Sequence, residues 1–250
     1  MPVPPIVVPE GFRIIAHRGA SAYAPENTLA AFRLAREMDA TEVETDVQLS
    51  ADGALVLCHD ETLDRYGHGT RVVEEMDSRE LLALDMGSWF SPHSFRNERM
   101  GTLRTLFETF ADEFVYHVEI KGKRDGLQRE LARLVDAFGL DARVIVTSFR
   151  LSALARMHAE APRLRLGWLV ERIDLAAAAS AGVPLFQLCP SAATVTPEDV
   201  AKAKSLVREV RAWGLSGPPA RVRELIARVV EAGCDGMTIN WPDWVVHAAH

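Results

Sequence analysis

Short apolar runs alternate with amphipathic stretches along almost the whole chain. The apolar runs cover residues 13–16, 42–47, 114–120, 143–147, 164–170, 185–188, 207–213 and 236–239. The stretches with a helical period cover residues 29–38, 127–138, 151–160, 174–181, 197–204 and 222–232. A strand followed by a helix, repeated in this way, predicts a parallel β-sheet. Eight such units in 250 residues favour a closed (β/α)8 TIM barrel over an open doubly wound sheet, as one domain spanning residues 1–250.

One segment interrupts this alternation after the second predicted strand. A short apolar run at 54–58 ends at His59 and Asp60, and a helix is expected near 78–84. Asp77, with Glu80 three positions further on, matches the capping-box pattern for the start of that helix. We therefore expect residues 61–102 to form an insertion subdomain, a small flap over the barrel mouth that shapes access of the substrate.

The second predicted strand carries an unusual row of acids. Side chains alternate across a strand, so Glu42, Glu44 and Asp46 share one face, and Val43 and Val47 share the other. In a barrel the acidic face points inward, where an unpaired buried carboxylate is very costly and needs a cation or protons. Two carboxylates two residues apart at the top of a strand form a good site for a hard cation such as Mg²⁺ or Ca²⁺.

The third predicted strand adds a further acid and a lysine. Glu119 and Lys121 share its inner face, near the carboxyl end where barrel enzymes place their functional residues. Glu119 is therefore a candidate third ligand beside Glu44 and Asp46, and Lys121 lies one pleat higher, where a ligand anion would bind. The alternative is a structural Glu–Lys ion pair.

Two histidines follow short apolar runs. His17 is followed by Arg18 and Gly19, a histidine for proton transfer and an arginine for a planar anion, although the same residues also suit a solvated turn. His59 alone would more often be structural. Two imidazoles at one barrel mouth, beside three acids, can instead serve as an opposed acid and base.

The segment Pro25-Glu26-Asn27-Thr28 precedes the first predicted helix. Its backbone role is the start of that helix, with Asn27 or Thr28 as the cap and an acid near the positive end of the helix dipole. Because this helix begins at the barrel rim, Glu26 and Asn27 can also face the site.

The charge of the chain and its cysteines limit the kinds of partner and the cellular compartment that we expect. The formal net charge is −7 and no basic stripe stands out, which argues against duplex nucleic acid as a partner. An anionic substrate therefore needs a local positive centre.

The three cysteines are few and widely spaced, which favours buried thiols in a reducing compartment over disulfides or zinc. We see no signal peptide and no apolar stretch of about 18 residues, so we expect a cytoplasmic protein without a membrane span.

Five motifs in order resemble the glycerophosphodiester phosphodiesterase family. They are His17-Arg18-Gly19, Pro25-Glu26-Asn27-Thr28, Glu44-Thr45-Asp46-Val47, His59-Asp60 and Glu119-Ile120-Lys121. Residues 61–102, with Gly87-Ser88-Trp89-Phe90, look like the insertion of that family. Thr147-Ser148-Phe149 and Asp235-Gly236-Met237-Thr238 resemble the ends of its fourth and eighth strands. The resemblance covers almost the whole chain.

The resemblance implies a reaction and a set of roles. The expected reaction is the hydrolysis of a glycerophosphodiester to glycerol 3-phosphate and an alcohol. One divalent cation, Mg²⁺, Ca²⁺ or Mn²⁺, is expected on Glu44, Asp46 and Glu119. His17 and His59 are expected as the catalytic pair, and the substrate is expected to contact Arg18, Lys121, Glu26, Phe149 and Trp213.

The chain also departs from the family pattern. The seventh strand of the family usually ends in a Trp followed by Thr-Val-Asn, whereas Trp213 is followed here by Gly214-Leu215-Ser216. Arg104-Thr105 replaces the paired acids that usually precede the second helix, at the rim. Glu42 is an extra inward acid, and we predict that it lies below the metal, pairs with His117 and is not a ligand.

Two other functions stay open from the sequence. A lysophospholipase D-type enzyme would need an apolar groove for an acyl chain, which the aromatics Trp89, Phe90, Phe149, Trp168 and Trp213 could line, although core packing is the simpler role for Trp168. A barrel that binds phosphorylated ligands without turnover is the other. The sequence leaves open the alcohol group, the oligomeric state, which histidine is the acid, and whether water or the glycerol 2-hydroxyl attacks phosphorus.

Overall fold

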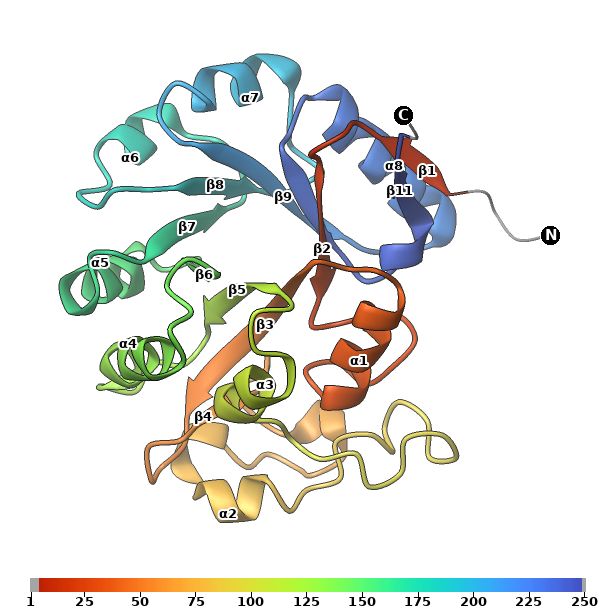
Figure 1. Cartoon of the computed structure of the whole chain (residues 1–250), viewed down its shortest axis with the longest axis vertical. Helices are drawn as coiled ribbons and strands as arrows, with labels where there is room; N and C mark the ends of the chain where they lie inside the picture. Colours follow the sequence, from red (N-terminus) through yellow and green to blue (C-terminus); the bar gives the residue numbers. More distant parts are fainter. Residues whose placement is uncertain (1–4, 249–250) are drawn as a thin grey trace.

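The computed structural model describes residues 5–248, and eight parallel strands form a closed barrel within them. The ring is closed because β2 pairs with both β3 and β10 (Figure 1). The barrel strands are β2 (Arg13–His17), β3 (Glu42–Leu49), β5 (Val115–Ile120), β6 (Val144–Ser148), β7 (Arg165–Val170), β8 (Gln187–Pro190), β9 (Glu209–Leu215) and β10 (Gly236–Ile239). The (β/α)8 barrel is confirmed, and each barrel strand overlaps one of the eight apolar runs.

Helices connect the strands and cover the outside of the ring (Figure 1). They are α1 (Leu29–Glu37), α3 (Leu103–Phe110), α4 (Leu127–Phe138), α5 (Leu151–Glu160), α6 (Leu175–Ala179), α7 (Pro197–Ala203) and α8 (Pro219–Glu231). Apolar side chains on the outer face of the strands, such as Val43 and Val210, pack against helix residues such as Phe32 and Ile226. None of the helices of residues 5–248 combines the length and apolarity that a bilayer crossing requires.

The register between β3 and β5 determines which polar side chains meet inside the barrel. Glu44 lies opposite His117, and Asp46 lies opposite Glu119. Because alternate residues of neighbouring parallel strands point to the same face, the acids of β3 and β5 converge at the carboxyl ends of the two strands.

The segment after β3 leaves the barrel. Strand β4 (Leu55–Leu57) pairs antiparallel with β3, and η1 (Asp64–Tyr66), η2 (Val73–Glu75) and α2 (Ser78–Leu81) follow, at the lower end of Figure 1. Apolar side chains of this segment form a small cluster of their own, which includes Leu63, Tyr66, Leu81 and Met86. It is separate from the two larger clusters around the barrel.

The capping box expected at the start of α2 is wrong. The side chain of Asp77 makes no capping hydrogen bond. Asp52, in the turn between β3 and β4, accepts hydrogen bonds from the backbone N–H and the hydroxyl of Ser78 instead, so the cap comes from a residue that is distant in sequence. A true capping box lies at α3, where Thr102 and Thr105 bond reciprocally. The α3 helix and the pairing of β1 (Ile6–Val8) with β11 (Val245–His247) were not anticipated from the pattern.

Candidate active site

Three carboxylates converge inside the carboxyl end of the barrel. Glu44, Asp46 and Glu119 are buried, and each offers one oxygen within 4.8 Å of the others. Glu44 and Asp46 lie two residues apart on β3, and Glu119 comes from β5, as the strand alternation predicts. Hard divalent cations prefer oxygen ligands of this kind.

The charges of these acids are poorly compensated. Burial and the neighbouring acids raise the pKa of Glu44, and burial and Asp46 raise the pKa of Glu119 to about 7. Burial also opposes ionisation of Asp46, but Arg18 and Lys121 outweigh it and lower the pKa of that carboxyl. Among residues 5–248, no group donates a hydrogen bond to Asp46 Oδ1. An orphaned buried carboxylate oxygen between two further acids fits a divalent cation.

Two cationic side chains flank the acids. Arg18 Nε lies 3.0 Å from Asp46 Oδ2, and the backbone N–H of Arg18 donates to Glu44 Oε2 over 3.3 Å. Lys121 Nζ lies 2.7 Å from Glu119 Oε1 and 3.8 Å from Asp46 Oδ1. The Glu–Lys ion pair considered from the sequence is therefore present, and it lies within the acid cluster, not apart from it.

The loop before α1 holds Arg18 and Asp46 in place. Glu26 accepts two hydrogen bonds from Arg18 Nη1, at 3.0 and 3.1 Å. Asn27 Nδ2 donates to Asp46 Oδ2 over 2.9 Å, and the side-chain Oδ1 of Asn27 accepts from the hydroxyl of Thr45 over 2.8 Å. Arg18 and Asn27 both have positive φ, near 56° and 57°, a backbone strain that often occurs at functional sites. Thr28 caps α1, so the helix-start role is confirmed, and the same segment contacts Arg18 and Asp46.

His17 is held entirely by the barrel. Its Nδ1 lies 2.6 Å from Asn240 Oδ1, just after β10, and its Nε2 lies 3.8 Å from Glu44 Oε2. Since an amide oxygen only accepts, Nδ1 carries the proton and Nε2 is the free acceptor. Burial, with Arg18 beside it, lowers the pKa of His17 to about 3.

His59 is held from the other side, by the segment after β4. Its Nδ1 lies 2.5 Å from Asp60 Oδ1, and Asp60 Oδ2 accepts from Arg65 Nε over 2.7 Å. Arg65 also bonds Glu26 over 2.6 Å, and its guanidinium lies over the ring of Tyr66. Burial lowers the pKa of His59, while Asp46 opposes that shift.

A cavity of about 230 Å³ opens between these groups. Eight of the ten sequence-predicted site residues line it: His17, Arg18, Glu44, His59, Glu119, Lys121, Phe149 and Trp213. The other two, Asp46 and Glu26, do not line it, and both form ion pairs with Arg18, which does. The rings of Phe149 and Trp213 meet edge to face with centroids 4.9 Å apart and form an aromatic wall. Trp168 is partly buried and packs against the core clusters, which agrees with the simpler interpretation, and Trp89 packs on Tyr66 and does not line the cavity.

Several residues at the site had no role assigned from the sequence. Asn240 bonds His17, and Arg65 bonds Asp60 behind His59. Arg211 lines the cavity, as do Thr147 and Thr238, which belong to the strand-end motifs quoted above. Strand alternation offered one signal, because Arg211 lies two residues before Trp213 and must share its inward face. The predicted partner of the extra acid is confirmed: Glu42 Oε2 lies 2.8 Å from His117 Nε2, outside the group of three metal-competent acids.

A β/α barrel with buried acids, two imidazoles and two cations around one cavity fits a phosphoric-diester hydrolase, because such groups neutralise a phosphodiester and transfer protons during its hydrolysis. Residues 17–244 match the model of the glycerophosphoryl diester phosphodiesterase family. The chain belongs to this family.

The similarity to individual relatives extends over nearly the full length of this chain. A glycerophosphodiester phosphodiesterase of Caldanaerobacter subterraneus is 33% identical, with 94% of this chain and 96% of that protein covered. The crystal structure of a glycerophosphodiester phosphodiesterase from Agrobacterium tumefaciens is 28% identical, with a TM-score of 0.75 over 93% of this chain and 98% of that one. An Oleispira antarctica phosphodiesterase, in complex with its product sn-glycerol-3-phosphate, is 27% identical, with a TM-score of 0.77 over 94% of both chains.

Proposed function

We propose that this protein hydrolyses glycerophosphodiesters to glycerol 3-phosphate and an alcohol, with one divalent cation and a pair of histidines. The observation that carries the proposal is the meeting of Glu44, Asp46 and Glu119 beside one cavity that both His17 and His59 line. The product complex of the Oleispira antarctica relative supports the same substrate class. The buried free cysteines support a reducing, cytoplasmic environment.

Glu44, Asp46 and Glu119 would hold the cation, which is Mg²⁺, Ca²⁺ or Mn²⁺. When bound, the cation neutralises charge on the phosphodiester as the transition state forms. Arg18 and Lys121 lie against the same acids, and their positive charges bind the non-bridging phosphate oxygens from two sides. Glu26 keeps Arg18 in its orientation.

The two imidazoles have different partners, and we assign them different tasks. His17 bonds a neutral amide and is held unprotonated by burial, so its Nε2 suits the acceptance of the proton from the attacking hydroxyl. His59 bonds Asp60, whose negative charge stabilises an imidazolium, so His59 suits the donation of a proton to the leaving alcohol oxygen.

A substrate panel tests the function. The purified protein, stripped with EDTA, is assayed with glycerophosphocholine, glycerophosphoethanolamine, glycerophosphoglycerol and lysophosphatidylcholine, with Mg²⁺, Ca²⁺ or Mn²⁺ added back. We expect metal-dependent release of glycerol 3-phosphate from the first three. Turnover of lysophosphatidylcholine alone would favour the lysophospholipase D-type activity. Metal-dependent binding without turnover would show a binding protein instead.

A further inference from the structure

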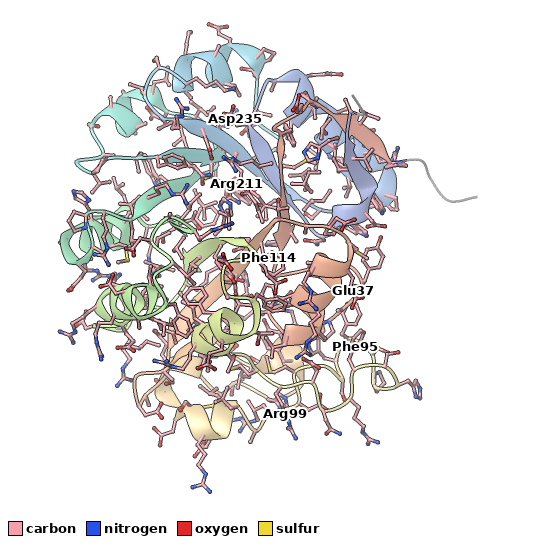
Figure 2. All side chains as sticks on the ribbon, viewed as in Figure 1. Glu37, Phe95, Arg99, Phe114, Arg211 and Asp235 are labelled. Atoms are coloured by element: carbon pink, nitrogen blue, oxygen red, sulfur yellow. The ribbon has the colours of Figure 1, made fainter. Side chains whose placement is uncertain are left out.

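Arg211 is a buried cation that the proposed chemistry does not use. It lies on β9 inside the ring of strands (Figure 2), and only 2% of it is exposed. Its neighbours on the inner face of β9 are otherwise engaged. Below it, Glu209 binds Arg13 and Gln187, and above it the indole N–H of Trp213 donates to the carbonyl of Val170.

The guanidinium of Arg211 has only part of its donors satisfied. Nη1 donates to the hydroxyl of Thr238, whereas Nε and Nη2 have no hydrogen-bond partner among residues 5–248. No carboxylate of the described chain forms an ion pair with Arg211. Burial raises the pKa of Cys189 beside it, so that thiol stays neutral and supplies no counter-charge. Leaving charged donors buried and unpaired is costly, and it calls for a partner from outside the chain.

The free donors lie on one edge of the guanidinium, in a residue that lines the cavity. Nε and Nη2 lie on the same side of the planar group, the edge that grips two oxygens at once. Arg211 lines the cavity that His17 and His59 also line. Thr147, on β6, lines it too, and its buried hydroxyl likewise lacks a partner among residues 5–248. Arg211 and Thr147 therefore bring unsatisfied polar groups from two different strands to the wall of one cavity, and we call these two residues together the β6–β9 patch.

We propose that the β6–β9 patch binds the glycerol hydroxyls of the substrate and so fixes which ester oxygen leaves. This inference rests on the proposed function and adds the determinant of its specificity. Two adjacent hydroxyl oxygens match the Nε/Nη2 edge of Arg211, and the Thr147 hydroxyl supplies a third bond. A buried cation repels choline or ethanolamine, so a cationic alcohol stays out of the patch and lies at the Phe149–Trp213 wall. The glycerol half thus keeps the phosphate and the alcohol half departs.

The test compares substrates with and without glycerol hydroxyls. Arg211→Met removes the donors while keeping the length of the side chain, and Arg211→Lys keeps the charge without the two-donor edge. For both variants we expect kcat/KM on glycerophosphocholine to fall about tenfold to a hundredfold, mainly through KM, since each bond to a charged donor contributes that much discrimination. The kcat/KM of both variants on bis(p-nitrophenyl) phosphate, which has no glycerol, should stay within about threefold of the wild-type value. Arg165→Met, an arginine at the amino end of β7, is the matched control and leaves both activities unchanged.

Equilibrium binding separates this inference from the proposed function. With Mg²⁺ present, Arg211→Met should weaken the binding of glycerol 3-phosphate by about tenfold or more, and the binding of inorganic phosphate by much less. This result supports the role of Arg211 even where wild type proves inactive on glycerophosphodiesters. Equal losses for both substrates and both ligands would show that Arg211 only balances the charge of the acids, and unchanged values would overturn the proposal. Thr147→Val gives a milder version of the same pattern and serves where the arginine variants do not fold.

Discussion

His17 and His59 line one cavity, but two different parts of the molecule hold them. His17 ends a barrel strand, and its partner Asn240 follows another, so its position comes from strand register and from the packed clusters around the barrel. His59 follows β4, and its partner Asp60 is held by Arg65 of the segment that leaves the barrel. One imidazole is positioned by the barrel backbone and the other by a chain of ion pairs.

Because the two imidazoles are held by different kinds of interaction, the two sides of the site should respond differently to salt and pH. Apolar packing and strand hydrogen bonds respond only weakly to moderate salt and to mild changes of pH. Half-exposed ion pairs such as Arg65–Asp60 are weaker and are screened by salt. The barrel side of the site should therefore stay formed under conditions that loosen the inserted side, and the variants below test that contrast in order of expected effect.

Removing either imidazole should have the largest effect. We expect His17→Ala and His59→Ala each to lower kcat by about 10²–10⁴-fold, because each loses a positioned proton acceptor or donor. Glycerol 3-phosphate binding and the melting temperature should change little, since neither ring fills the core. Turnover is measured in a coupled assay for glycerol 3-phosphate, and a variant that keeps more than a tenth of wild-type kcat would exclude its histidine from proton transfer.

Arg65 should matter next, although it does not line the cavity. Arg65→Met breaks its bonds to Asp60 and Glu26 together, and with them the positions of His59 and Arg18. We expect kcat/KM to fall about tenfold, with Arg65→Lys recovering part of the loss. Arg79→Met, on the exposed helix α2, is the control for removing a positive charge from the same segment. An Arg65→Met enzyme with wild-type kinetics would show that the inserted segment does not position the site.

The barrel half of this site follows from the sequence, whereas in the inserted half the sequence pointed to His59 and Asp60 but not to the contacts that hold them. The period-two pattern of 42–47 places Glu44 and Asp46 inward, because alternation within one strand is a local property. Asp60–Arg65–Glu26 joins residues whose spacing follows no helix or strand period, so only the folded chain brings them together. Arg211 falls between these cases, since its face was predictable but its unsatisfied donors were not. The failed capping box at Asp77 has the same origin, because the distant Asp52 took that role.

Asp60→Asn should shift the pH dependence of the enzyme without abolishing activity. The Asp60 carboxylate raises the pKa of His59 against the lowering by burial, so its neutral replacement should lower that pKa further. A proton donor with a lower pKa is lost earlier as pH rises, and the alkaline limb of the kcat profile should move to lower pH. Asn240→Ala, the matched change at His17, should lower kcat by a few-fold and leave that limb in place. Equal shifts in both variants would contradict the assignment of His59 as the donor.

Acid should loosen the inserted segment before the barrel, and this is the smallest effect we expect. Hydrogen bonds from Ser50 and Ser78 lower the pKa of Asp52 to about 2. Burial opposes the same change at Asp60, but Arg65 outweighs it and also brings that pKa to about 2. These folded values lie below the ordinary 3.8, so the stabilisation is complete above about pH 4 and is lost as pH falls toward 2. Hydrogen exchange, corrected for its intrinsic pH dependence, should show residues 61–102 losing protection in that window while barrel strands keep theirs. Asp52→Asn should already show part of the loss at pH 5, and simultaneous loss of protection in both regions would mean that the inserted segment and the barrel unfold as one unit.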